Sequence, residues 1–229
     1  LLAVPLFLDV DDFRDEIETA VEAASGRELT IEGPLSLSLI TGPKIAAETV
    51  AISNPEGFDA RHFMRAEKIE VAVALLPLLS KHIEVQYFSL TKPEINLLRK
   101  SNGDVNWARD GGSEGEAEGP AELGIAALRI EEGVVHYADE QTGALYQLTA
   151  INAELSFKSL QGPFDLDAAF LLDGVPLALK ARSGRLDQDN TKTEIALDFD
   201  EAAVSLVLNG MLHMERRRFS GDLTLEGKD

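Results

Sequence analysis

The feature that most constrains the fold is an alternation of apolar and polar residues that returns along most of the chain. Successive side chains of a strand point to opposite faces of a sheet, so this period of two predicts strands with one apolar and one polar face. We therefore expect a mostly β protein. The alternating apolar positions, each of which faces either a protein core or a lipid, are Leu35, Leu37, Leu39, Ile69, Val71, Val73, Phe164, Leu166, Leu177, Leu179, Ile195, Leu197 and Phe199.

Short turn sequences separate these strands. Asn102-Gly103 and Asp173-Gly174 are typical of tight turns. Short connections favour antiparallel pairing, because a parallel crossover needs a dozen or more residues. The sequence therefore predicts a curved antiparallel sheet or groove, with a β-sandwich as the alternative.

One helix is expected, near the N-terminus. Asp11 or Asp12 can cap its first turn, and Gly26 can end it. The apolar residues that recur at steps of three and four, and so share one helical face, are Phe13, Ile17, Ala20, Val21 and Ala24.

A segment rich in glycine and glutamate divides the chain. It predicts a flexible acidic linker over residues 110–121, between a helix-plus-strand region at 1–109 and an all-strand region at 122–229. Strand pairing can resume after such a loop, so both regions can belong to the same sheet.

Charge and composition exclude several classes of function. The chain has 21 basic and 40 acidic residues and a formal net charge of -19, which disfavours nucleic acid and anionic membrane surfaces as partners. It has no cysteine, and hence no thiolate zinc site and no thiol nucleophile.

No catalytic or cofactor motif is present. The four histidines lack the spacing of a zinc enzyme, and there is neither a nucleophile elbow nor a phosphate-binding loop. The acidic clusters at 9–16 and 187–190 lack the glycine of a calcium loop. The single Trp107 is expected to pack rather than to stack on a ligand. We expect no catalytic residues, metal or cofactor, although two carboxylates positioned by the fold would still make a hydrolase.

The first eight residues are apolar but too few to span a bilayer. Two interpretations remain open. The segment is either the end of a longer apolar stretch, such as a membrane helix or a signal-peptide core, or a buried N-terminal strand.

Several local patterns together resemble the N-terminal region of the AsmA family of bacterial envelope proteins. The resemblance covers residues 9–108 and continues more loosely through Leu128–Gly133, Tyr137–Asp139 and Asn209-Gly210. The patterns that carry it are Asp11–Arg14, Gly26–Gly33, Ser53–Phe58, Leu75–Ser80, Pro93–Leu97 and Asn102–Trp107.

The resemblance implies a periplasmic protein anchored in the inner membrane, in which the anchor is expected to lie outside this chain. It also implies a role in outer-membrane biogenesis, similar to that of bridge-like lipid transfer proteins. The implied partners are phospholipid or another lipid, and outer-membrane assembly components.

The predicted strands are compatible with lipid binding. A sheet with one apolar face can shield acyl chains, because each methylene removed from water contributes about 0.8 kcal/mol. The same alternation arises when apolar faces pack on each other. The alternative is therefore a structural or protein-binding β domain without a lipid groove.

Overall fold

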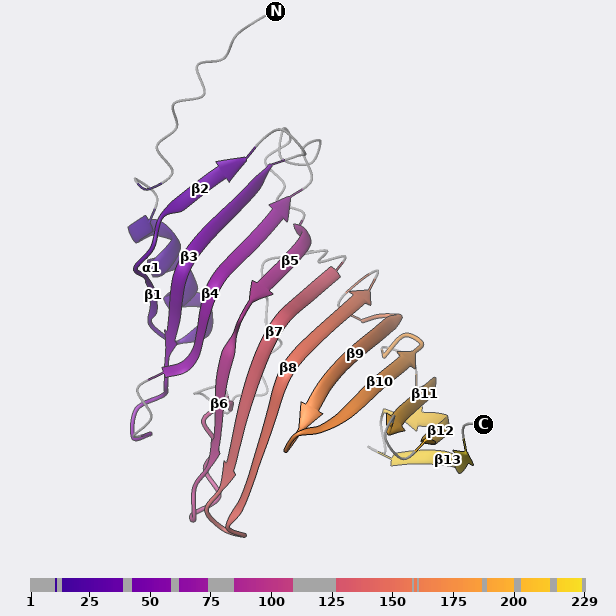
Figure 1. Cartoon of the computed structure of the whole chain (residues 1–229). Helices are drawn as coiled ribbons and strands as arrows, with labels where there is room; N and C mark the ends of the chain where they lie inside the picture. Colours follow the sequence, from indigo (N-terminus) through magenta and orange to yellow (C-terminus); the bar gives the residue numbers. More distant parts are fainter. Residues whose placement is uncertain are drawn as a thin grey trace, which may run out of the picture.

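The computed structural model describes residues 11, 14–38, 43–58, 62–73, 85–108, 127–157, 159, 161–186, 189–199, 203–214 and 218–227. They form one helix, α1 (Arg14–Ser25), and one 13-stranded sheet (Figure 1). The strands are β1 (Leu29–Ile31), β2 (Leu35–Ser38), β3 (Lys44–Ser53), β4 (His62–Val73), β5 (Val85–Thr91), β6 (Glu94–Arg99), β7 (Ala127–Asp139), β8 (Ala144–Phe157), β9 (Phe164–Leu172), β10 (Val175–Ser183), β11 (Asn190–Phe199), β12 (Val204–His213) and β13 (Arg218–Gly227).

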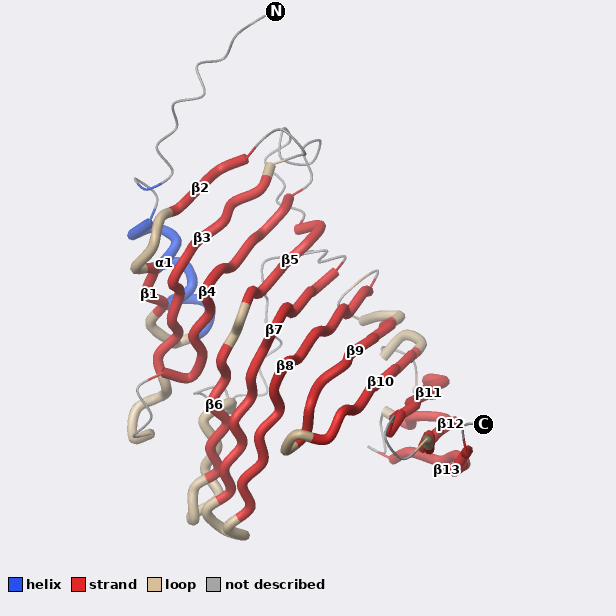
Figure 2. The backbone as a smooth tube through the Cα atoms, in the orientation of Figure 1, coloured by secondary structure: helices blue, strands red, loops and turns tan. Residues whose placement is uncertain are grey.

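The strands follow one another across the sheet almost in chain order. The order is β1-β3-β4-β5-β7-β8-β9-β10-β11-β12-β13, with β2 paired to β3 and β6 paired to both β4 and β7. The sheet is curved, and its strands turn progressively from β2 to β13 (Figures 1 and 2). A mostly β fold with one N-terminal helix and a curved sheet is therefore confirmed, and the described residues contain no second layer of strands.

Two strand pairs depart from the predicted antiparallel arrangement. β7 runs parallel to β5 and to β6. The connection from β6 to β7 spans residues 100–126, which is long enough for the crossover that parallel strands need. Through these pairs, strands on both sides of residues 109–126 share one sheet. The predicted linker itself lies outside the described residues, as do residues 1–10.

The helix matches its sequence pattern. The backbone N–H of Gly26, at φ 71°, donates to the carbonyl of Glu22 at 2.8 Å and ends the helix in a left-handed cap. Ile17 and Val21 pack against a buried cluster formed by Leu29, Ile31, Leu35 and Val50. The carboxylate of Asp11 accepts hydrogen bonds from the Arg14 guanidinium and the Leu35 N–H, whereas Asp12 and Phe13 lie outside the described residues.

The long strands change conformation along one line across the sheet, which we call the seam. It is marked by four residues with left-handed backbone angles, Thr49, Lys92, Glu132 and Ala150, whose φ values are 50°, 47°, 53° and 49°. Three of them lie close together across neighbouring strands: the N–H of Lys92 donates to the carbonyl of Glu131, next to Glu132, at 2.7 Å, and the N–H of Glu132 donates to the side chain of Asn152, two residues from Ala150, at 3.3 Å.

The seam keeps apolar side chains on one face. Apolar residues are spaced by two within each half of a strand but by three across the seam, as from Ala47 to Val50 in β3. Both Ala47 and Val50 nevertheless contact the same core cluster under the helix. The steps in the other strands are Ala66 to Ile69, Leu90 to Pro93, Ile130 to Gly133 and Leu148 to Ile151.

Candidate functional site

Two uninterrupted rows of apolar residues cross the sheet on one face, which we call the apolar face. Each row takes one residue from every strand between β2 and β13 except β6, and spans roughly 50 Å at the usual strand spacing. The first row is Leu35, Ala47, Ile69, Leu90, Ile130, Ala153, Ala168, Leu179, Leu197, Leu206 and Leu225. The second row is Leu37, Ile45, Val71, Phe88, Leu128, Leu155, Leu166, Ala181, Ile195, Leu208 and Leu223.

The opposite face carries a different chemistry, and we call it the polar face. Between the positions of the two apolar rows, each strand has one residue whose side chain points to the opposite face. These residues form a row in which several members make ion pairs. Arg129 contacts Glu154 at 3.1 Å, and Glu70 lies 3.2 Å from Lys68. Members of this row include Ser36, Glu70, Ser89, Arg129, Glu154, Asp167 and Lys180.

Among described elements, only α1 covers the apolar face, at the end formed by β1 to β4. Leu35 and Leu90 are buried, whereas most of the row members beyond them are half-buried. Leu223 and Leu225, on the last strand, are each 68% exposed. The apolar face therefore becomes more accessible toward β13.

The predicted alternating positions converge on this face. Leu35 and Leu177 are buried; Leu37, Ile69, Val71, Phe164, Leu166, Leu179, Ile195, Leu197 and Phe199 are half-buried. Leu39 lies outside the described residues, and Val73 is described only as a member of β4. The members on β3, β5, β7 and β8, including Phe88, Leu128 and Leu155, were not predicted from the sequence.

Aromatic residues border the apolar face at the edge of the sheet where β7 ends and β8 begins (Figure 1). Tyr137 pairs with Leu97 on one side and Tyr146 on the other. Its ring centroid lies 6.1 Å from those of both Trp107 and Tyr146. Trp107 is 41% exposed and Tyr146 is 51% exposed. Trp107 therefore contacts Tyr137 but stays partly exposed, and it is not the buried core residue that the sequence favoured.

Asn106 positions Trp107. Its fully buried side chain accepts the Leu98 N–H at 2.9 Å and donates to the Asn96 carbonyl at 2.7 Å. The Asn106 side chain therefore gives the backbone of β6 the hydrogen bonds that a neighbouring strand would provide. The Arg27 guanidinium donates to the Asn106 carbonyl at 2.7 Å and fixes the same turn to the end of the helix.

A cation lies beside the aromatic row. Arg99 follows Leu97 on the apolar face of β6, and its Nη1 lies 3.8 Å from Oδ2 of Asp139. The Asp139 carboxylate is buried, which raises its pKa, but hydrogen bonds from the backbone N–H groups of Gln141 and Thr142 outweigh burial and leave the pKa below its ordinary value. Asp139 thus stays ionised at neutral pH.

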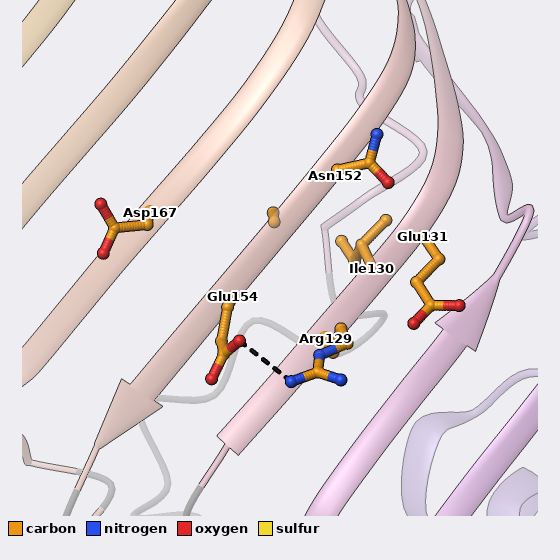
Figure 3. Close-up of a pocket in the computed structure, with 7 residues that line it drawn as sticks. Arg129, Ile130, Glu131, Asn152, Glu154 and Asp167 are labelled. Carbon is orange, nitrogen blue, oxygen red and sulfur yellow. Dashed lines mark hydrogen bonds and ion pairs between the residues drawn. The ribbon is translucent and has the colours of Figure 1, made fainter.

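Two hollows lie among charged residues of the described strands on the polar face. One of about 380 Å³ is lined by charged residues of β7, β8 and β9, and Figure 3 shows Arg129 pointing toward Glu154 across it. Another, of about 810 Å³, contains the Lys92 to Glu67 ion pair at 2.8 Å. Within the described ranges, no group of three or more histidine or acidic residues could hold a metal ion.

No helix among the described residues has the length and apolar character needed to cross a membrane. The AsmA family model matches residues 1–222. Protein AsmA of Escherichia coli (strain K12) is 33% identical over 103 residues, which cover 42% of this chain and 15% of the relative. The AsmA family protein YhjG of the same organism is 21% identical over an alignment that covers 95% of this chain and 37% of the relative. The chain thus spans well under half the length of either relative.

Proposed function

Since this chain belongs to the AsmA family, we propose that it is a non-catalytic module of the bacterial envelope whose apolar face shields lipid acyl chains. Family membership supports the envelope-associated role. The finer proposal is a periplasmic module that is anchored to the inner membrane and serves outer-membrane biogenesis.

The observation that carries the proposal is the pair of unbroken apolar rows. A soluble sheet normally buries such a face under a second layer, because exposed aliphatic surface is unfavourable in water. Beyond α1, no described element supplies that layer. Acyl chains of a lipid would cover the face and leave the polar face in water.

The rows also favour movement of the bound lipid. Their members are almost all aliphatic, so an acyl chain meets similar surface at each strand. Burial contributes about 0.8 kcal/mol for each methylene and requires no directed contact. A lipid would therefore be held strongly while it shifts across the strands.

A second candidate function is protein binding at β13. This strand pairs only with β12 among the described strands, and Leu223 and Leu225 are largely exposed. An exposed edge can accept a strand from a partner. Outer-membrane assembly components are the partners expected in that case.

Native mass spectrometry of the purified chain tests the lipid proposal. We expect phospholipid to copurify with the wild type and with Ala196→Glu, and to be lost from Leu197→Glu. These two residues are neighbours on β11, but Leu197 belongs to an apolar row whereas Ala196 lies on the polar face opposite Lys180. The two variants add the same charge on opposite faces.

Circular dichroism must show that both variants keep their strands. Lipid-free wild-type protein would overturn the proposal for this chain. If both folded variants copurify with the same amount of phospholipid, the lipid does not bind on the apolar face.

A further inference from the structure

The end of the apolar face at β6, β7 and β8 differs from its middle. The rows are aliphatic except for Phe88, whereas this margin carries Trp107, Tyr137 and Tyr146 with Arg99 beside them. An aromatic ring with a polar tip suits a boundary between apolar and wet surroundings. This margin therefore has the chemistry of a lipid interface.

Arg99 adds an incompletely satisfied cation to this margin. Its separation of 3.8 Å from Asp139 is too long for a hydrogen bond, and its Nε is buried without a hydrogen-bond partner among the described residues. Its side chain is nevertheless 43% exposed. A guanidinium in this state can still bind a phosphate group, for which its fork of donors is well suited.

We propose that Arg99 and the aromatic row form a headgroup subsite for a zwitterionic phospholipid. The acyl chains lie on the apolar face, the glycerol region contacts Trp107 and Tyr137, and the phosphate binds Arg99. The nearby Asp139 and Glu140, together with the net charge of -19, disfavour a headgroup with net negative charge. The proposal rests on the lipid function above and adds the orientation and headgroup class of the ligand.

Trp107 is the only tryptophan in the chain, so its fluorescence reports on this site alone. The probe is phosphatidylcholine brominated either near the glycerol end or near the methyl end of its acyl chains. We expect stronger quenching of Trp107 by bromine near the glycerol. Stronger quenching by bromine near the methyl end, or no quenching of lipid-loaded protein, would overturn the subsite.

The phosphate contact has its own test. Wild-type protein should bind phosphatidylcholine more tightly than diacylglycerol with the same acyl chains. In Arg99→Gln the ratio of the two affinities should fall about tenfold. Arg129→Gln is the matched control, because Arg129 is also 43% exposed but lies on the polar face. The same ratio of phosphatidylcholine to diacylglycerol affinity in Arg99→Gln and Arg129→Gln would overturn the role of Arg99.

Free glycerophosphocholine separates a lipid site from a simple phosphate site. We expect it not to compete with phosphatidylcholine, and effective competition would overturn the lipid assignment. These outcomes are distinct from failure of the proposed function, in which native mass spectrometry would detect no phospholipid on the wild-type chain.

Discussion

Asn106 Nδ2 donates a hydrogen bond to Asn54 Oδ1 at 2.8 Å, which joins two turns that are 52 residues apart in the sequence. The same side chain closes the edge of β6 through Leu98 and Asn96. It therefore couples the turn that carries Trp107 to the sheet.

Asn106→Ala should lower the free energy of unfolding by about 3 kcal/mol, because it leaves buried backbone groups without partners. Urea unfolding followed by circular dichroism measures the loss. Asn209→Ala, at an exposed position on β12, is the control and should change stability by less than about 0.5 kcal/mol. Equal losses would show that the amide of Asn106 has no special role.

Gly33, between β1 and β2, permits a close approach of the chain to β3. A Cβ at this position would lie 2.5 Å from the Glu48 carbonyl oxygen, which is backbone and cannot move aside easily. Gly33→Ala should therefore cost about 2 kcal/mol of unfolding free energy. At Gly227 a Cβ would meet no atom within 4 Å, so Gly227→Ala should leave the melting temperature near that of the wild type. A stable Gly33→Ala protein would contradict the close approach.

Glu70 should contribute to the acid sensitivity of the fold. Burial raises its pKa, but Lys68 and Lys44, at 3.2 and 3.5 Å, outweigh burial and hold the pKa below its ordinary value of 4.5. A carboxylate whose pKa is lower in the folded than in the unfolded state stabilises the fold at pH values above the unfolded-state pKa. This contribution is lost as the pH falls through the folded-state pKa.

Glu70→Gln removes that contribution. The difference in unfolding free energy between wild type and Glu70→Gln should therefore be largest near neutral pH and shrink as pH falls below 4.5. Urea unfolding across this pH range measures it, with Glu226→Gln on the exposed β13 as a comparison. A difference that stays constant with pH would contradict the role of the lysine pairs.

Local periodicity predicted much of the fold. The helix ends at Gly26 as expected, and the tight turn at Asp173-Gly174 has φ values of 49° and 87°. The alternating strands β9 to β13 also follow their sequence pattern, because each keeps a period of two along its whole length.

The sequence did not predict β3, β7 and β8, in each of which the seam interrupts the alternation, and it predicted only the part of β4 that follows the seam. In β7, Leu128 and Ile130 are followed by Gly133 and Val135, so a strict period of two fails midway. The sequence signal that could have revealed them is a single spacing of three residues between apolar positions, with a spacing of two residues on either side.

Pairing direction and the aromatic margin could not be predicted in the same way. The alternation of apolar and polar residues is the same in parallel and antiparallel strands. It therefore could not predict that β6 and β7 pair in parallel. Tyr137 and Tyr146 meet only because β7 and β8 pair in that register, and Trp107 joins them only through the contacts of Asn106.

Site-specific photocrosslinking can show which face of the sheet contacts lipid. A benzophenone amino acid replaces Leu197 on the apolar face or Ala196 on the polar face, and the protein is irradiated in cells that supply their own lipids. We expect covalent phospholipid adducts at position 197 and none at position 196. Adducts at 196 alone, equal adducts at both positions, or no adduct at 197 in folded protein would contradict lipid binding on the apolar face.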